Sequence, residues 1–192
     1  LKDKTQVFMF EKGDYYRNRL THTLEVSQIA RSVSRKFQLN EDLAECISLC
    51  HDLGHSPFGH VGEDIISQEL DHNFDHNIQS FRQVTLLEKK YVSYDGLNLS
   101  WETLDGLIKH NGPIQDPIHE YNLSPEFSFN LNKYPSLEAQ IASISDDIAY
   151  IAHDFDDGIR SEILSLKKLS KNNILFEFID FEICDCFLKF SL

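Results

Sequence analysis

Hydrophobic residues recur along this chain at the spacing of α-helices. In residues 18–37 they form one broad stripe when successive residues are set about 100° apart, and the stripe consists of Leu20, Leu24, Val26, Ile29, Val33 and Phe37. The same spacing predicts a second helix after Asn40, a third after Ser100 and a fourth over residues 135–154. Asn40 and Ser100 favour helix N-termini, and Gly54 is interpreted as the residue that ends the second helix.

Segments without helical periodicity are few. Residues 6–10 (QVFMF) are the best candidate for a strand, and the signal is weak. Residues 117–136 are rich in Pro, Asn and Ser, which is typical of a long loop. We therefore predict an all-α fold.

Composition and charge narrow the function classes. The 192 residues are 41% hydrophobic and 26% charged, as in one globular domain. The net charge of −13, with no basic run, argues against a nucleic acid as the main partner. No apolar run could span a bilayer, no secretory leader opens the chain, and none of the four cysteines forms a CxxC pair. We therefore expect a cytoplasmic protein that does not bind membranes.

Histidines stand on the inward side of the first two predicted helices. His22 precedes Val26 by four residues and so points to the core side of its helix. His51 follows Ile47 by four residues, and Asp52 is its neighbour. Two inward imidazoles beside a carboxylate form a nitrogen and oxygen ligand set suited to a divalent transition metal.

The fourth helix is predicted to have two faces that are turned away from solvent. One is a bulky apolar stripe, predicted to pack into the core, of Leu137, Ile141, Ile144, Ile148 and Ile151. The opposite face carries Ala139, Ala142, Asp146, Ala149, Tyr150 and His153. Small alanines leave room beside Asp146, Tyr150 and Asp154, which follow one another at intervals of four residues. We interpret this second face as the wall of a pocket.

These residues resemble a known family. The order His22, His51-Asp52, Asp146 is similar to the H…HD…D signature of the HD-domain metal-dependent phosphohydrolases. Five ordered segments resemble motifs of the branch that hydrolyses deoxynucleoside triphosphates (dGTPase-like proteins): RLTHTLEVSQIAR, HDLGHSPFGHVGED, FDHNIQSFR, GLNLSWETLDGLIKHN and PSLEAQIASISDDIAYIAHDFDDGIR. The resemblance runs from about Lys4 to about Ile163 and implies an HD-type helical bundle.

The resemblance also implies residue roles. One divalent metal ion would be held by His22, His51, Asp52 and Asp146. Asp147 is the rival for the last place, but it falls off the alanine face. The catalytic group would consist of His55, His60, Glu63 and His76, with the choice between His55 and His60 as proton carrier left open. Substrate would be bound by Gln6 at the sugar 3′-hydroxyl, by Arg19 at the triphosphate, and by Tyr150 and Asp154 along the deoxyribose. Lys109 and His110 are interpreted as charges that complement the dipole of the third helix.

The implied reaction is hydrolysis of a dNTP, by attack at the α-phosphorus, to a deoxynucleoside and inorganic triphosphate. Manganese, magnesium, iron, cobalt, nickel and zinc all suit the ligand set. A homo-oligomer is expected, and because family members are longer we expect a shortened member, with an HD domain over residues 1–165 and an aromatic-rich tail over residues 166–192. Two alternatives stay open: an HD phosphohydrolase acting on another phosphate ester, and a nucleotide-binding module without turnover.

Overall fold

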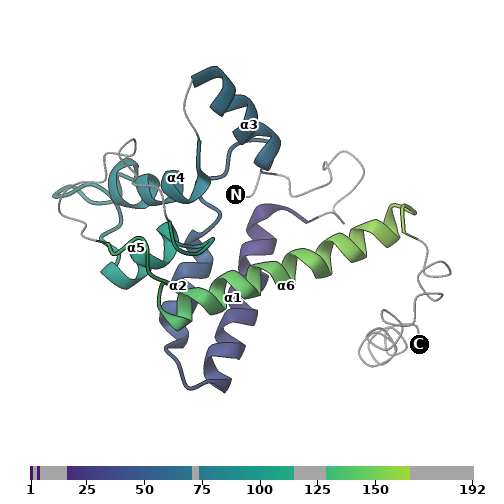
Figure 1. Cartoon of the computed structure of the whole chain (residues 1–192), viewed down its shortest axis with the longest axis horizontal. Coiled ribbons are helices and arrows are strands. Elements are labelled where there is room, and N and C mark those ends of the chain that lie inside the picture. The colour runs from purple at the N-terminus through teal and green to yellow at the C-terminus, as the bar shows by residue number, and fades with distance from the viewer. Residues whose placement is uncertain (2–3, 5–16, 71–73, 115–128, 165–192) are drawn as a thin grey trace. The chain divides into compact units, whose positions relative to one another are not determined.

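The computed structural model describes residues 1, 4, 17–70, 74–114 and 129–164. They form helices and connecting turns, with no strand among them, which confirms the all-α prediction for this part of the chain (Figure 1). The helices are α1 (Arg19–Lys36), α2 (Glu41–Cys50), α3 (Gly59–Leu70), α4 (His76–Arg82), the π-helical turn η2 (Gln83–Leu87), α5 (Trp101–Ile108) and α6 (Leu137–Arg160). The candidate strand at residues 6–10 lies outside the described residues. None of the described helices is both long and apolar enough to cross a bilayer.

Side-chain caps explain where the helices begin. The Asn18 side chain accepts from the Thr21 amide while the Thr21 hydroxyl accepts from the Asn18 amide, which is a capping box at the start of α1. Asn40 caps α2 by accepting from two backbone amides, and Ser100 caps α5 by accepting from the Thr103 amide. The N-caps at Asn40 and Ser100 agree with the sequence prediction. Helices α3 and α4 are additional to it, because neither carries a long apolar stripe.

The chain divides into two compact units, Leu1–Tyr150 and Ile151–Leu192, and the division falls within α6. In the second unit the Leu164 amide donates to the Gly158 carbonyl just beyond the end of α6. The predicted boundary at residue 165 stays a prediction, because the described residues end at Leu164.

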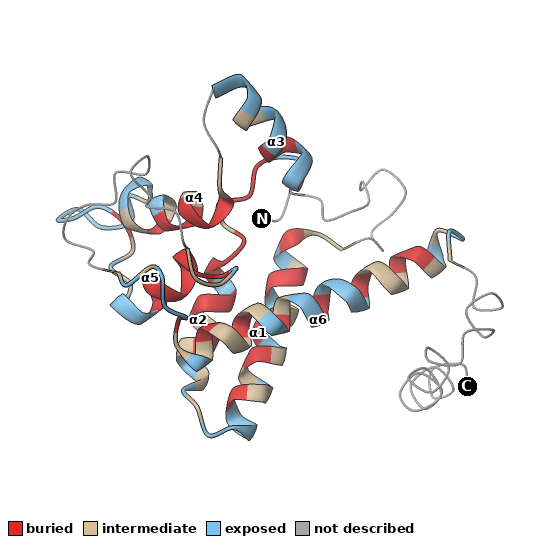
Figure 2. Ribbon diagram, in the orientation of Figure 1, coloured by how far each residue is buried: buried red, intermediate tan, exposed pale blue. Residues whose placement is uncertain are grey.

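The core of the first unit forms where α1, α2, α5 and the first turns of α6 meet. Helices α1 and α2 pack side by side, and Figure 2 shows their buried faces. Ile47 of α2 packs on Ala139 and Ala142 of α6, and all three are at most 1% exposed. Gly106 of α5 is packed so closely that an added Cβ would lie 2.7 Å from the Ile47 side chain and 3.0 Å from Ala139. A second cluster joins α2, α4 and α5 through Cys50, Phe81, Val84, Leu104 and Leu107.

The bulky face of α6 is not in the core as expected. Ala139, Ala142 and Ala149 are buried, whereas the isoleucine stripe that we predicted to be core is largely exposed. Ile144 is 58% exposed and Ile148 is 47% exposed. The physical reason is that alanines let two helix axes approach closely, so α6 packs on its small-residue face and turns the bulky one outward.

Candidate metal centre

The four residues expected to bind a metal lie together in the first unit. His22 comes from α1, His51 and Asp52 follow the last turn of α2, and Asp146 comes from α6. His22 Nε2 lies 2.7 Å from Asp146 Oδ1, and His51 Nε2 lies 3.6 Å from both Asp146 Oδ1 and Asp52 Oδ1. The two imidazoles and Asp52 are at most 2% exposed. Asp147 is exposed on the next position of α6, so of the two carboxylates only Asp146 joins this group, which we call the HD cluster.

His51 is oriented as a metal ligand. Its Nδ1 donates to the Ser48 carbonyl oxygen at 2.6 Å, which places the ring proton on Nδ1 and leaves the Nε2 lone pair facing the HD cluster. Nε2 is buried and has no hydrogen-bond partner among the described residues. A buried lone pair with its tautomer fixed in this way suits coordination of a cation.

Both carboxylates of the HD cluster are held in the charged form. Burial alone would raise the pKa of Asp52, but the contact with His55 and the charges of His51 and Arg19 hold it well below its usual range. Burial opposes ionisation of Asp146 as well, and the contacts with His110, His22 and His51 lower its pKa below the usual range. Asp52 Oδ2 is buried without a partner in the described structure. The HD cluster offers two imidazole nitrogens and two carboxylate groups, and two of these donor atoms, His51 Nε2 and Asp52 Oδ2, have no hydrogen-bond partner in the described structure. Such a donor set fits a divalent transition ion.

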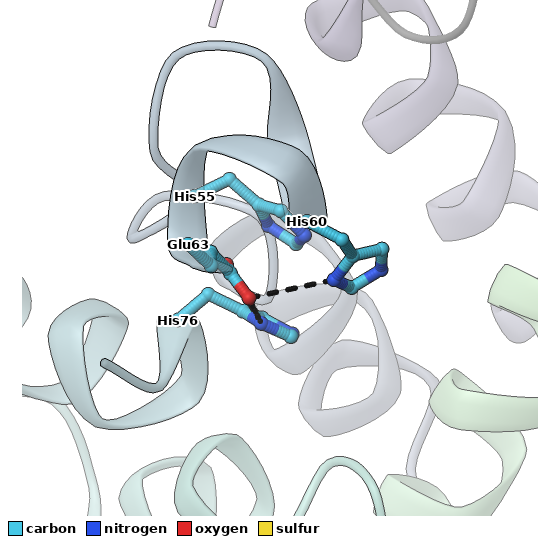
Figure 3. Close-up of side chains that lie close together, drawn as sticks. All are labelled: His55, His60, Glu63 and His76. Carbon is cyan, nitrogen blue, oxygen red and sulfur yellow. Dashed lines mark hydrogen bonds and ion pairs between the residues drawn. The ribbon is translucent and has the colours of Figure 1, made fainter. Parts of the chain in front are cut away.

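A second group of imidazoles lies on the loop after α2 and on the helices that follow. His55, His60, Glu63 and His76 form this second cluster, shown in Figure 3. Glu63 Oε2 lies 3.4 Å from His60 Nδ1, and Glu63 Oε1 lies 3.1 Å from His76 Nδ1. The His55 and His76 rings stack at 4.0 Å between centroids. Burial lowers the pKa of His55, whereas the His60 side chain is 79% exposed.

Asp52 connects the two clusters. Its Oδ1 accepts from Arg19 Nη1 at 3.0 Å and lies 2.9 Å from His55 Nδ1. Arg19 is itself 6% exposed, and Gly59, with φ of +57°, leaves space for it: an added Cβ there would lie 3.0 Å from Arg19 Nη2. One carboxylate therefore touches the HD cluster, the second cluster and a buried guanidinium.

Gly54 has a different role from the one the sequence suggested. Its φ is not in the left-handed region, so it is not a helix-ending glycine of the kind expected. Instead an added Cβ would lie 2.2 Å from the Ser80 amide nitrogen and 2.3 Å from the His76 carbonyl oxygen. The Gly54 amide donates to Ser80 Oγ, and Ser80 Oγ donates to the His51 carbonyl. Gly54 thus lets the loop lie directly against α4.

Lys109 and His110 also differ from the interpretation given to them. Both are buried, so neither is a surface charge at the end of α5. Lys109 Nζ lies 2.6 Å from Asp105 Oδ1, and His110 Nε2 lies 3.4 Å from Asp146 Oδ2. The available signal was a Lys-His pair ending a mostly apolar helix, with Asp105 one turn before Lys109.

The residues expected to bind substrate lie in different parts of the chain, and one of them is not among the described residues. Tyr150, on α6 in the first unit, is 45% exposed. Asp154 lies further along α6, in the second unit, and is half-buried. Gln6 lies outside the described residues. Their roles stay predictions.

Comparison with known proteins gives one family. A model of the HD domain matches residues 19–173. A deoxyguanosinetriphosphate triphosphohydrolase-like protein of Brucella ovis is 52% identical over 185 residues, which cover 89% of this chain and 46% of that protein. Proteins of the same description from Bartonella quintana and Bradyrhizobium sp. are 54% and 52% identical over 178 and 181 residues. The chain spans about half the length of the curated relatives it matches.

Proposed function

The chain belongs to the HD domain family, and from this premise we propose that it hydrolyses a deoxynucleoside triphosphate to a deoxynucleoside and inorganic triphosphate. The observation that carries the proposal is the contact of Asp52 with both clusters, because it sets a candidate metal site beside a group of imidazoles. The triphosphohydrolase-like relatives support the choice of substrate class.

The HD cluster would hold one divalent ion through His22, His51, Asp52 and Asp146. When bound, such an ion supplies positive charge to phosphate oxygens and acidifies a bound water. The chain prepares for it by keeping both carboxylates ionised and the His51 Nε2 lone pair turned inward. This local positive charge would also allow a protein with net charge −13 to take an anionic substrate.

Arg19 is the group we assign to the triphosphate. Its guanidinium is buried and is fixed on one side by Asp52, while Nη2 lies next to Gly59 in the loop of the second cluster. A guanidinium offers planar, paired donors that match phosphate oxygens, and one that is already oriented loses little freedom on binding. Arg19 would therefore hold the triphosphate between the two clusters.

His60 is the group we assign to proton transfer. In the reaction a water oxygen bonds to the α-phosphorus, the bond from phosphorus to the sugar 5′-oxygen breaks, and that oxygen must receive a proton. His60 has an exposed side chain whose Nδ1 faces Glu63, so its Nε2 is left for the substrate. His55 instead has its Nδ1 against Asp52 and its ring stacked on His76. Glu63 would orient His60, and His55 and His76 would line the phosphate path.

Three residues would select the nucleoside. Tyr150 and Asp154 would line the deoxyribose, and Gln6 would bind its 3′-hydroxyl. These assignments rest on the resemblance of the surrounding motifs. We also propose a homo-oligomer in the cytoplasm on the same ground.

Incubation of manganese-loaded protein with each of the four dNTPs, with ion-exchange detection of products, tests the proposal. Equal amounts of deoxynucleoside and inorganic triphosphate are expected. Release of monophosphate or pyrophosphate would point to an HD phosphohydrolase with another cleavage position. Thermal stabilisation by dNTP without any product would identify a nucleotide-binding module, and either result would overturn the proposed reaction.

A further inference from the structure

His110 is a buried imidazole that the proposed reaction leaves unused. It follows the last turn of α5, is 5% exposed, and lies with its ring centroid 5.0 Å from that of His51. Its Nε2 forms a hydrogen bond of 3.4 Å with Asp146 Oδ2, the carboxylate oxygen opposite the one that faces His22 and His51. His110 thus contacts a proposed metal ligand, Asp146, through the carboxylate oxygen that does not face His22 and His51, while its own ring lies beside that of His51.

The proton on His110 can be assigned by comparison with His51. His110 Nε2 lies 3.4 Å from Asp146 Oδ2, and because a carboxylate oxygen accepts, Nε2 is the ring nitrogen that donates. The Nδ1 of His110 is buried without a partner in the described structure, whereas His51 Nδ1 donates to the Ser48 carbonyl. An N–H buried without an acceptor costs more than an unused lone pair, so the His110 proton belongs on Nε2.

With its proton on Nε2, His110 is suited to a different role from that of His51. A metal-binding imidazole presents a bare nitrogen to the ion and donates its other N–H to an outer partner, as His51 is arranged to do. His110 presents an N–H to the Asp146 carboxylate and has no acceptor behind it. The arrangement is that of an outer partner of a metal ligand.

We propose that His110 is a positioning residue of the metal centre, whose Nε2–H donates to Asp146 Oδ2 and fixes the carboxylate with Oδ1 toward His22 and His51. The inference deepens the proposed function, because it concerns the same metal centre. A carboxylate held on one oxygen keeps the other aimed at the ion, which raises metal affinity without adding a ligand.

The packing around α5 provides a rigid support for this contact. Gly106 allows α5 to lie directly against Ile47 of α2 and Ala139 of α6. Lys109, the neighbour of His110, is tied to Asp105 by a buried ion pair within the same turn. The end of α5 is therefore held against the two helices that carry His51 and Asp146.

Two amide substitutions test the proposal. In His110→Gln the side-chain amide nitrogen falls near the position of Nε2 and can still donate to Asp146, whereas in His110→Asn it falls near Nδ1 and cannot reach. Manganese affinity is measured by electron paramagnetic resonance of the free ion. We expect about 10–100-fold weaker binding in His110→Asn and near-native binding in His110→Gln.

Other outcomes would overturn it. Equal manganese affinity in all three proteins would show that His110 does not act on the centre. Equal losses in both variants, with a changed cobalt(II) absorption spectrum in His110→Gln, would identify His110 as a ligand instead. Lower thermal stability of both metal-free variants with native manganese affinity would indicate a packing role alone. Wild-type protein that binds manganese but releases no triphosphate would refute the proposed reaction and leave the His110 comparison intact.

Discussion

The HD cluster and the second cluster use the same types of side chain, and they differ most in the exposure of one imidazole, His60. In the HD cluster His51 is 2% exposed and two ionised carboxylates accompany the imidazoles. In the second cluster Glu63 contacts two of the three imidazoles, His60 and His76, and the His60 side chain is 79% exposed. Burial with a fixed tautomer suits the binding of an ion, whereas an exposed imidazole can exchange protons with substrate and solvent.

The difference begins in the local backbone. His51 is placed by the regular end of α2, where its Nδ1 reaches a carbonyl one turn back. His60 follows two residues with positive φ, Phe58 at +68° and Gly59 at +57°, which turn the chain outward before α3. Helix geometry thus buries one imidazole, and a turn exposes the other.

Removal of His51 should give the largest effect. We expect His51→Ala to lose its bound metal and to lower turnover by more than about 1,000-fold, because a direct ligand is removed. Metal content after dialysis and triphosphate release are the two measurements. Unchanged helix content by circular dichroism would serve as the control for folding. Retention of stoichiometric metal in this variant would contradict the assignment of the HD cluster.

Removal of His60 should distinguish the role of the second cluster from that of the HD cluster. We expect His60→Ala to retain its metal while turnover falls by about 100-fold or more, since an acid–base group contributes effects of that order. Glu63→Gln should lower turnover less, because it keeps the imidazole and loses only its orienting charge. Loss of metal in His60→Ala would mean that the clusters are not independent in function.

A third change targets the loop that joins the clusters. Gly54→Ala would place a Cβ against the backbone of Ser80 and His76, and we expect about 1–3 kcal/mol lower stability in urea unfolding. Ser80→Ala removes only the two hydrogen bonds of that hydroxyl, so it should cost about 1 kcal/mol. If Gly54→Ala were as stable as wild type, the close approach of the loop to α4 would be wrong.

The sequence predicted the HD cluster well because helical spacing carries angular information. His22 and His51 share a face with buried residues four positions away, and Asp146 shares the alanine face of α6. The structure brings these side chains together from three helices. The resemblance to the HD family suggested the four ligands, and the helical spacing favoured Asp146 over its neighbour Asp147.

The same reasoning failed where tertiary packing decides. Both faces of α6 carry apolar residues, so periodicity could not tell which one packs against α2, and the isoleucine stripe was assigned to the core wrongly. His110 lies beyond the end of α5, where helical spacing no longer predicts direction. Gly54 is required by a contact with a distant segment, which no local pattern reveals.

The smallest effect we predict is the pH dependence of the metal-free protein. The pKa of Asp146 is lowered on folding, so its contribution to stability is complete above its unfolded pKa and is lost as pH falls below about 4. The pKa of His51 is raised, because the contact with Asp146 and the charges of Asp52 and Asp146 outweigh burial. The contribution of His51 to stability has the opposite pH dependence: it is present below about pH 6.5 and is lost as pH rises through the folded pKa.

Asp146→Asn should therefore flatten the acid side of the stability curve. Between pH 4 and pH 3 the wild-type chain should lose about 0.9 kcal/mol more than the variant, because the unfolded carboxyl takes up about two thirds of a proton over this interval while the folded one stays ionised. Urea unfolding in the presence of a chelator at pH 5, 4 and 3 measures this difference in slope. Because the slopes are compared, a constant offset in stability between the two proteins does not affect the result. Parallel curves would show that Asp146 is not ionised against the imidazoles of the HD cluster, and the contrast with the exposed His60 imidazole would lose its electrostatic basis.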